Sequence, residues 1–336
     1  MMKSLPQLWY QPNVVVWFLL PLSWLYCFIS VMRRKLYQLN IKKSYSSQVP
    51  VVVVGNIVAG GSGKTPLLIG LCEYLRNKGF KPGVVSRGYG GSVSGVKQVT
   101  ETDSADVVGD EPLMIFRKTN VPVVVAADRV AAVNYLLEHN HCDVVLSDDG
   151  LQHYRMKRDF EIAVVDSARR FGNNFCLPAG PLRERVSRLN EVDMVVYNGR
   201  ESITSGQCYY LLEIAGVNKL AGENSSQLSS QLSSFCGKPV HAVAGIGHPQ
   251  RFFEQLRQNG LEVIEHAYAD HHEYRQHDFS GWNNECIIMT EKDAVKCRHL
   301  SLADAWVVSV KAVFSDALEA RLSTELLPLL KRFNAY

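Results

Sequence analysis

The sequence predicts an α/β fold, with a doubly wound parallel sheet joined to a second, smaller α/β unit and preceded by an apolar helix. Two features of the chain predict the sheets. Six short runs rich in valine and other apolar residues lie between residues 51 and 198, and helix-like segments separate several of them. Apolar strands that alternate with helices are typical of a parallel sheet covered on both faces. A second pattern of this kind begins at residue 239.

The first element is an uncharged, mostly apolar segment from Val14 to Val31. As a helix it is about 27 Å long, close to the roughly 30 Å hydrocarbon core of a bilayer. Arg33, Arg34 and Lys35 follow it, so the positive-inside rule places the large C-terminal part in the cytoplasm. A secretory signal peptide is the alternative, but such a peptide carries its charges before the apolar run, whereas here they follow it. We therefore expect residues 1–37 to associate with a membrane, by spanning it or by lying in its interface; a buried core helix is the alternative.

Length and composition exclude several classes of protein. The 336 residues suffice for two domains of about 150 residues each. A formal net charge of +3 does not indicate the basic surface of a nucleic-acid-binding protein. The 8 cysteines contain no C-x-x-C pair, which fits reduced thiols in the cytosol.

A glycine-rich loop follows the first predicted strand, Val51 to Val54, and leads into a predicted helix from Pro66 to Lys78. Backbone N–H groups of such a loop and the start of the helix bind phosphate oxygens, the lysine neutralises phosphate charge, and the threonine is a ligand for Mg²⁺. The loop is a variant, because valine stands where the strict pattern has its first glycine. A chance glycine turn is the alternative. The predicted nucleotide-binding residues are Val58, Ala59, Gly60, Gly61, Ser62, Gly63, Lys64 and Thr65.

Two carboxylates stand at the end of the predicted strand Asp143 to Asp148, which Asp149 and Gly150 follow. A nucleotide-bound Mg²⁺ needs oxygen ligands at such a strand end. Acidic pairs also occur in ordinary turns, so the pair indicates a metal site only in combination with the glycine-rich loop. We expect Thr65, Asp148 and Asp149 to bind the metal, and leave open which carboxylate contacts it.

The remaining elements complete two units and a connection between them. A serine-rich stretch from Asn224 to Ser234 indicates a linker. The expected organisation is a membrane-associating segment at 1–37, a nucleotide-binding domain at 38–205, a linker at 206–235 and a smaller C-terminal α/β domain at 236–336. The other predicted elements are strands at 83–86, 121–126, 160–166, 193–198, 208–214, 239–244, 261–264, 287–290 and 306–310, and helices at 249–259 and 317–333.

An ordered set of short motifs resembles the tetraacyldisaccharide 4'-kinase family of lipid A biosynthesis. The motifs are Gly55-Asn56 with Gly60 to Pro66, Ser86 to Gly91, Gly109 to Pro112, Asp128-Arg129, Asp148 to His153, Pro178 to Glu184, Asp270 to His272 and Thr290 to Asp293. The resemblance implies a P-loop NTPase-like fold and an inner-membrane lipid kinase, with ATP and Mg²⁺ as cofactors. It implies transfer of the γ-phosphoryl group to the 4'-hydroxyl of tetraacyldisaccharide 1-phosphate, which gives the 1,4'-bisphosphate, lipid IVA.

The resemblance also implies roles for two residues. Asp110 matches the carboxylate that acts as catalytic base in the family, and His271 is similar to the histidine that partners it from the second domain. His272 is the adjacent alternative. A helix N-cap is the alternative interpretation of Asp110, and a cap and a base can coexist. A zinc site is a further interpretation of His266, His271, His272 and His277, but no cysteine lies at ligand spacing.

Other motif residues are expected to line the nucleotide or sugar side of the cleft. Arginines in this group suit phosphate binding, although pairing of Arg129 with Asp128 or of Arg183 with Glu184 on the surface is the alternative. The predicted cleft residues are Arg87, Tyr89, Glu111, Arg129, Gln152, His153, Arg183 and Glu184.

Two other functions remain open on the sequence. A membrane-tethered P-loop switch or assembly ATPase would use water as the attacking group, and a kinase for another lipid or sugar would share the same loop. The expected partners are the lipid substrate and the membrane surface, without nucleic acid, at the cytoplasmic face of the inner membrane.

Overall fold

The computed structural model describes residues 9–10, 14–220, 229–230, 232–282 and 284–334. Their strands form one 13-stranded sheet in the order β11-β10-β12-β13-β8-β7-β6-β1-β5-β2-β4-β3, with β9 paired to β8. The strands are β1 (Val51–Gly55), β2 (Pro82–Ser86), β3 (Val96–Gln98), β4 (Val123–Ala126), β5 (Val144–Asp148), β6 (Phe160–Asp166), β7 (Met194–Asn198), β8 (Cys208–Lys219), β9 (Ser229–Ser230), β10 (Pro239–Ala244), β11 (Glu262–Ala267), β12 (Ile287–Thr290) and β13 (Ala305–Phe314).

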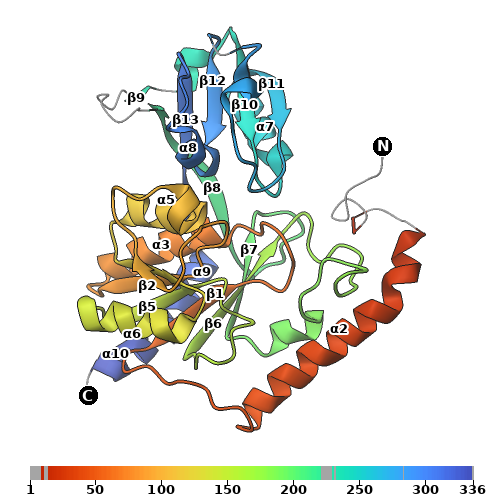
Figure 1. The fold of residues 1–336 in the computed structure, drawn as a ribbon, viewed down its shortest axis with the longest axis vertical. Helices are drawn as coiled ribbons and strands as arrows, with labels where there is room; N and C mark the ends of the chain where they lie inside the picture. The colour runs from red at the N-terminus through yellow and green to blue at the C-terminus, as the bar shows by residue number, and fades with distance from the viewer. Residues whose placement is uncertain (1–8, 11–13, 221–228, 231, 283, 335–336) are drawn as a thin grey trace.

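Helices cover both faces of this sheet, and Figure 1 shows an upper lobe with β10 to β13 and a lower lobe with β1 to β7. The helices are α2 (Val15–Gln38), α3 (Lys64–Asn77), α4 (Ala105–Val108), α5 (Asp110–Thr119), α6 (Arg129–His139), α7 (Pro249–Gln258), α8 (Glu291–Cys297), α9 (Asp316–Arg321) and α10 (Leu327–Asn334), with a π-helical turn at Leu322–Leu326 and 3-10 turns at Val186–Asn190, Leu232–Phe235 and Gln276–Phe279.

The predicted doubly wound sheet is confirmed in the lower lobe. Strand β1 lies between β5 and β6 and is parallel to both. Strand β2 lies parallel to β5 on its other side, and only the edge pair β3 and β4 is antiparallel within this lobe. The carboxyl ends of β1, β2 and β5 therefore meet at one edge, where the ligands of open α/β sheets bind. Strand β4 begins at Val123 rather than at Val121, because Pro122 has no N–H to donate to a neighbouring strand.

Alternating side chains of β1 separate two hydrophobic cores. Val52 and Val54 pack with Leu67 of α3 and Leu113 of α5 on one face. On the other face Val51 and Val53 pack in a second core, which includes residues of α6. Successive side chains of a strand point to opposite faces, so a run of valines is buried on both. The helices packed on both faces of the sheet leave its edge at the carboxyl ends of the strands as the place for the functional side chains.

The chain crosses between the lobes on two long antiparallel strands. β8 pairs with β13 along most of its length, with a bulge between Ser309 and Val310. Residues 208–219, the first half of the predicted linker, are thus a sheet strand, whereas 221–228 and 231 lie outside the described residues. After β13 the last helices return to the lower core, where Leu322 and Leu330 are buried. The division into two units stays a prediction, and these contacts favour assigning 316–334 to the first unit.

Helix α2 lies along the outside of the lower lobe (Figure 1). Val16, Leu20, Ser23 and Cys27 form its buried stripe, at spacings of three and four residues that put them on one helical face. The Ser23 hydroxyl donates to the Cys176 carbonyl at 2.7 Å. Helix α2 is long and apolar enough to cross a membrane, and only 22% of its apolar 18-residue window is buried in the protein. The alternative of a buried core helix is therefore wrong.

Candidate active site

The glycine-rich loop lies where the sequence predicts, between β1 and α3. Gly63 has a left-handed backbone (φ 88°), and Lys64 and Thr65 open the helix as buried residues. The Asn56 side chain donates to the Ser62 hydroxyl at 2.9 Å. From outside the loop, the Tyr210 hydroxyl donates to the Gly63 carbonyl at 2.5 Å. These hydrogen bonds fix the conformation of the loop.

The variant position of this loop has a packing role. Val58 is 9% exposed and belongs to the core that lies against α6. It forms an isolated antiparallel bridge with Leu182, and the next residue, Ala59, donates its N–H to the Pro181 carbonyl at 2.7 Å. The start of the loop is therefore anchored to the 181–182 segment. We infer that valine replaces the usual glycine because the side chain at this position fills the core.

The two carboxylates after β5 differ in their surroundings. Asp148 is 2% exposed; its Oδ2 accepts from Ser86 Oγ at 3.0 Å, and its buried Oδ1 has no hydrogen-bond partner among the described residues. Burial raises the pKa of Asp148, and the charges of Glu111 and Asp149 raise it further. Asp149 lies 3.6 Å from Lys64 Nζ and accepts from Arg183 at 2.8 Å. Burial raises the pKa of Asp149, but these two cations outweigh it and hold it well below the usual range.

A divalent cation fits the oxygen atoms at this edge. Asp148 Oδ1 is a buried carboxylate oxygen without a hydrogen-bond partner from the described residues, a costly group that a metal would satisfy. Asp149 Oδ1 also lacks a hydrogen-bond partner among these residues, but it lies 3.6 Å from Lys64 Nζ. The Thr65 hydroxyl is a second hard oxygen donor. No group of three or more His, Cys, Asp or Glu side chains suited to a metal occurs in the part of the chain that the structure describes. His271 contacts Asp110 and His272 contacts Asp278, so these two histidines of the zinc interpretation do not converge on one point. Mg²⁺ needs no such cluster, because it binds through one or two protein ligands and substrate phosphates.

Asp110 and His271 meet across the two lobes. Asp110 is 5% exposed, and His271 Nδ1 lies 3.1 Å from its Oδ2. Burial raises the pKa of Asp110, but the hydrogen bond from His271 and the charge of Lys292 outweigh it, so that the pKa lies below its usual value. The same hydrogen bond raises the pKa of His271 despite its partial burial. The pair is thus arranged to keep Asp110 ionised.

The N-cap interpretation of Asp110 is wrong. The cap of α5 is Gly109, and Asp110 is the first residue of the helix. Gly109 has φ 92°, and a Cβ there would lie 2.8 Å from the Tyr89 carbonyl oxygen, so only glycine fits. This close approach brings the Tyr89 loop against the start of α5. Asp110 still accepts from the Glu111 N–H at 2.9 Å, which fixes its Oδ1 while Oδ2 faces His271.

His272 points away from this pair. Its Nε2 lies 3.3 Å from Asp278 Oδ2, and its ring stacks on Tyr268 at 4.6 Å between centroids. His271, by contrast, has φ 63°, and its ring meets that of Tyr89 edge-on at 5.1 Å. A left-handed backbone is uncommon for a residue other than glycine and marks sites where the surroundings impose it. The geometry therefore favours His271 as the partner of Asp110.

Lys292 is a central residue that was not among the predicted site residues. Its Nζ lies 2.9 Å from Asp270, 3.1 Å from Glu111, 3.8 Å from Asp110 and 3.5 Å from His271 Nε2. Burial lowers its pKa, but Glu111 and Asp270 outweigh this and raise it. Lys292 belongs to the Thr290 to Asp293 motif at the start of α8. That motif contributed to the family resemblance, but it predicted no role for the lysine. Lys292 links the upper lobe to the acidic start of α5.

The predicted cleft residues divide into two groups. Arg87, Tyr89, Glu111, Arg129, Gln152, His153 and Arg183 line one polar cavity. Arg129 is 3% exposed and donates to the carbonyls of Ala126 and Asp148, so the alternative of a surface pair with Asp128 is wrong. Glu184 does not line this cavity; it is 4% exposed, accepts from Gln152 at 2.8 Å and lies 4.0 Å from Arg34 of α2. Glu184 thus supports the wall rather than facing the cleft.

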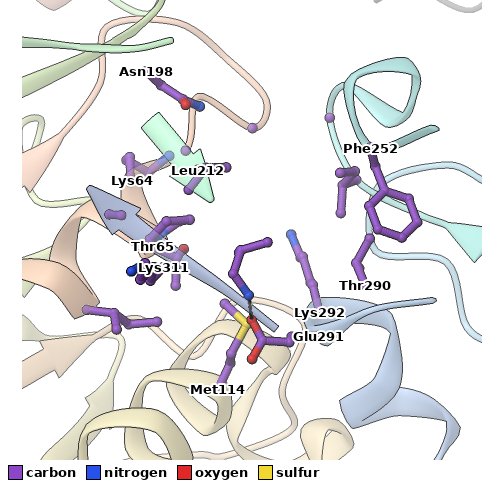
Figure 2. A pocket seen from close by; sticks show the side chains of 18 of the residues that line it. Lys64, Thr65, Met114, Asn198, Leu212, Phe252, Thr290, Glu291, Lys292 and Lys311 are labelled. Atoms are coloured by element: carbon purple, nitrogen blue, oxygen red, sulfur yellow. Dashed lines mark hydrogen bonds between the residues drawn. The ribbon is translucent and has the colours of Figure 1, made fainter. Parts of the chain in front are cut away.

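Two cavities meet at the glycine-rich loop. The polar cavity, of about 610 Å³, also contains Asp110's partner His271, the Asp148–Asp149 pair, and Tyr26 and Arg33 from α2. An apolar cavity of about 400 Å³ lies between the lobes, with Ile69, Met114, Leu212, Ile246 and Phe252 in its walls. Figure 2 shows Lys64 and Thr65 on one side of the apolar cavity and Phe252 and Thr290 on the other. Gly61, Lys64, Glu111 and Asp270 line both cavities.

Comparisons with known proteins agree over nearly the whole chain. The sequence model of a family described as tetraacyldisaccharide-1-P 4'-kinase matches residues 15–327. The chain is 45% identical over 328 residues to a protein named tetraacyldisaccharide 4'-kinase from Shewanella frigidimarina, which covers 97% of this chain and 96% of that one. A protein of the same name from Methylobacillus flagellatus is 42% identical over 331 residues, 98% of either chain. A crystal structure of LpxK from Aquifex aeolicus in complex with ATP is similar with a TM-score of 0.78 and 26% identity, covering 95% of this chain and 99% of that one.

Proposed function

Because this chain belongs to the tetraacyldisaccharide-1-P 4'-kinase family, we propose that it transfers the γ-phosphoryl group of ATP to the 4'-hydroxyl of a tetraacyldisaccharide 1-phosphate. The observation that carries this function is the pairing of Asp110 with His271 beside a phosphate-binding loop. A phosphoryl transfer to a hydroxyl needs such a base, whereas a nucleotide switch does not. Family membership and this pair favour the kinase over the tethered switch.

ATP is proposed to lie across both cavities. The purine and ribose occupy the apolar cavity, where Phe252, Leu212 and Met114 offer apolar surface. Phosphates then cross the glycine-rich loop, where backbone N–H groups and the start of α3 favour negative charge. Lys64, which lines both cavities, would meet the β- and γ-phosphates. The γ-phosphoryl group reaches the polar cavity, beside the acceptor.

Thr65 and Asp148 would hold Mg²⁺, which supplies charge neutralisation on the transferring phosphates when it is bound. Asp149 is engaged by Lys64 and Arg183, so we assign it to orienting these cations rather than to direct metal contact. Ser86 fixes the Asp148 carboxylate at 3.0 Å. This division of labour follows from the different partners of the two neighbouring aspartates.

Asp110 is proposed to accept the proton of the 4'-hydroxyl while the hydroxyl oxygen attacks the γ-phosphorus. The new O–P bond forms as the bond between the γ-phosphorus and the β,γ-bridging oxygen breaks, and ADP leaves. His271 orients Asp110 through its hydrogen bond and stabilises its ionised form. Lys292 holds Glu111 and Asp270 around the pair. These residues come from both lobes, so closure of the lobes assembles the site.

A labelling experiment tests the proposed function. Purified protein with γ-labelled ATP, Mg²⁺ and detergent-dispersed tetraacyldisaccharide 1-phosphate is expected to transfer label to the lipid. The matching 1,4'-bisphosphate has no free 4'-hydroxyl and is expected to accept no label. ATP hydrolysis without labelled lipid would contradict the kinase and favour the switch.

Helix α2 is proposed to lie in the interface of the inner membrane, at its cytoplasmic face. Its outward side exposes Trp17 (68%), Phe18 (80%), Trp24 (65%) and Phe28 (62%), while the opposite stripe packs on the protein. A helix that is apolar towards lipid and packed on the other face can lie in the interface plane. Tyr26 and Arg33 of this helix line the polar cavity, which supports delivery of a lipid acceptor from the same membrane.

Replacing both exposed tryptophans of α2, Trp17→Glu with Trp24→Glu, is expected to weaken binding to phospholipid vesicles about tenfold or more, because two large apolar contacts are lost. Co-sedimentation with vesicles measures this. Phe333→Glu serves as the control, because Phe333 is a 40% exposed aromatic side chain on another helix, α10. Equal binding of the double variant and the unmodified protein would show that this face does not contact lipid.

A further inference from the structure

A small basic recess extends from the polar cavity towards α2. Its lining residues are Arg33, Tyr37, Ala127, Asp128, His153 and Arg155, and its volume is about 260 Å³. Arg33, Ala127 and His153 also line the polar cavity, so the two spaces share a wall. The proposed chemistry at Asp110 and Lys64 uses none of the residues that are specific to this recess. Its position and charge therefore need a separate explanation.

Two guanidinium groups face the recess without full neutralisation. Arg33 is exposed, and no hydrogen bond or ion pair joins its side chain to another of the described residues. Arg155 is 58% exposed and donates to Asp128 Oδ2 at 2.7 Å. That carboxylate is already engaged, because its Oδ1 caps α6 by accepting from the Val130 N–H at 3.0 Å. The recess thus contains one carboxylate and two guanidinium groups, so its net charge is positive.

The neighbouring histidine, His153, is affected by burial and by the same arginine charges. Burial is the main cause that lowers the pKa of His153 to about 4; the charges of Arg129, Arg158 and Arg33 contribute to the lowering, and the charge of Asp128 opposes it. His153 is therefore neutral at physiological pH. A ring nitrogen of a neutral imidazole can donate one hydrogen bond to an anion without adding a further charge.

We propose that this recess binds the phosphate monoester that the acceptor lipid already carries, with Arg33 and Arg155 as its ligands. The inference rests on the proposed function and deepens it. The proposed function places the hydroxyl to be phosphorylated at Asp110, whose partner His271 lines the polar cavity, so the phosphate-bearing end of the acceptor lies farther along that cavity. The recess shares a wall with that cavity and is lined by Arg33 and Tyr37 of α2. Arg33 stands one helical turn after the exposed Ile29, which puts the anionic group and the acyl chains on adjoining surfaces of α2.

A substrate and variant comparison tests this assignment. The unmodified protein is expected to prefer the tetraacyldisaccharide 1-phosphate over the same lipid without its 1-phosphate, measured as kcat/KM. Arg155→Gln and Arg33→Gln are each expected to reduce this preference about tenfold, mainly through KM, and the double variant to abolish it. The KM for ATP should not change. A loss of activity that is equal for both acceptors would overturn the inference, because the recess would then not recognise the phosphate.

Matched controls separate recognition from membrane attraction. Lys35→Gln removes an exposed cation from α2 and Lys157→Gln removes one two residues after Arg155; neither residue lines the recess, and both variants should keep the preference. If the recess instead held a bulk phospholipid headgroup, Arg155→Gln would weaken binding to phosphatidylglycerol vesicles and leave the acceptor preference unchanged. That result overturns the inference but not the kinase. Failure of the unmodified protein to label either acceptor would overturn the proposed function itself.

Discussion

Replacing Lys64 by alanine is expected to lower kcat/KM for lipid phosphorylation by about 10³-fold, the upper range for loss of one preorganised group that stabilises developing charge. Lys64 is 8% exposed, opens α3 and faces both cavities, so its ammonium group acts where water is scarce. Negative charge moves from the γ-phosphoryl group to the leaving ADP during the transfer. Loss of the cation therefore raises the energy of the transition state more than that of the free enzyme.

The fold is expected to survive this change. Asp149, the partner of Lys64, keeps its hydrogen bond to Arg183 at 2.8 Å, so no carboxylate becomes isolated. The melting temperature should shift by only a few degrees, which corresponds to about 1 kcal/mol in a protein of this size. Lys81→Ala removes an exposed lysine that directly precedes β2 and should keep full activity. An active Lys64→Ala variant would place the phosphates away from this loop.

Residues that act through local structure could be predicted from the sequence. The order of strand, glycine-rich loop and helix places Lys64 and Thr65 because a loop between adjacent elements has little freedom. The acidic pair follows from the same rule, since parallel β1 and β5 must end at one edge. A run of valines predicts burial on both faces but leaves the strand order open. The continuous sheet through β8 and β13 depends on pairing between residues about 100 positions apart, which no local pattern encodes.

Contacts between the lobes could not be predicted from local sequence patterns either, because they also join residues that are far apart in the chain. Lys292 meets Glu111 across 181 positions of the chain. A lysine in a short helix is ordinarily a solvated surface residue, and nothing in Thr290 to Asp293 shows that it is buried among carboxylates. Similarly, Glu184 lies in a matched motif, yet it supports α2 through Arg34 instead of facing the cleft. A motif locates a segment; packing decides which of its side chains reach the cavity.

Replacing Asp110 by asparagine is expected to lower kcat by about 10³-fold, within the range of 10² to 10⁴ for loss of a general base. The amide has nearly the same shape as the carboxylate, so ATP should still bind with a similar KM. It cannot accept the proton of the 4'-hydroxyl. Asp106→Asn is a matched control, because Asp106 is an exposed aspartate on the preceding helix α4. Full activity of Asp110→Asn would assign the base to another residue.

The partner histidine gives this prediction a second readout, in the pH dependence. The hydrogen bond that His271 donates to Asp110 raises the pKa of His271, so its NMR titration should move down towards the usual value of about 6.5 in Asp110→Asn. In the opposite variant, His271→Asn, the hydrogen bond and charge of the histidine no longer lower the pKa of Asp110. The effect of burial, which raises this pKa, is then less compensated, and the pKa of Asp110 should rise. The acid limb of kcat/KM depends on a base that must be ionised, and it should therefore move to higher pH. An acid limb that stays in place would show that His271 does not tune Asp110, and would leave it only a positioning role.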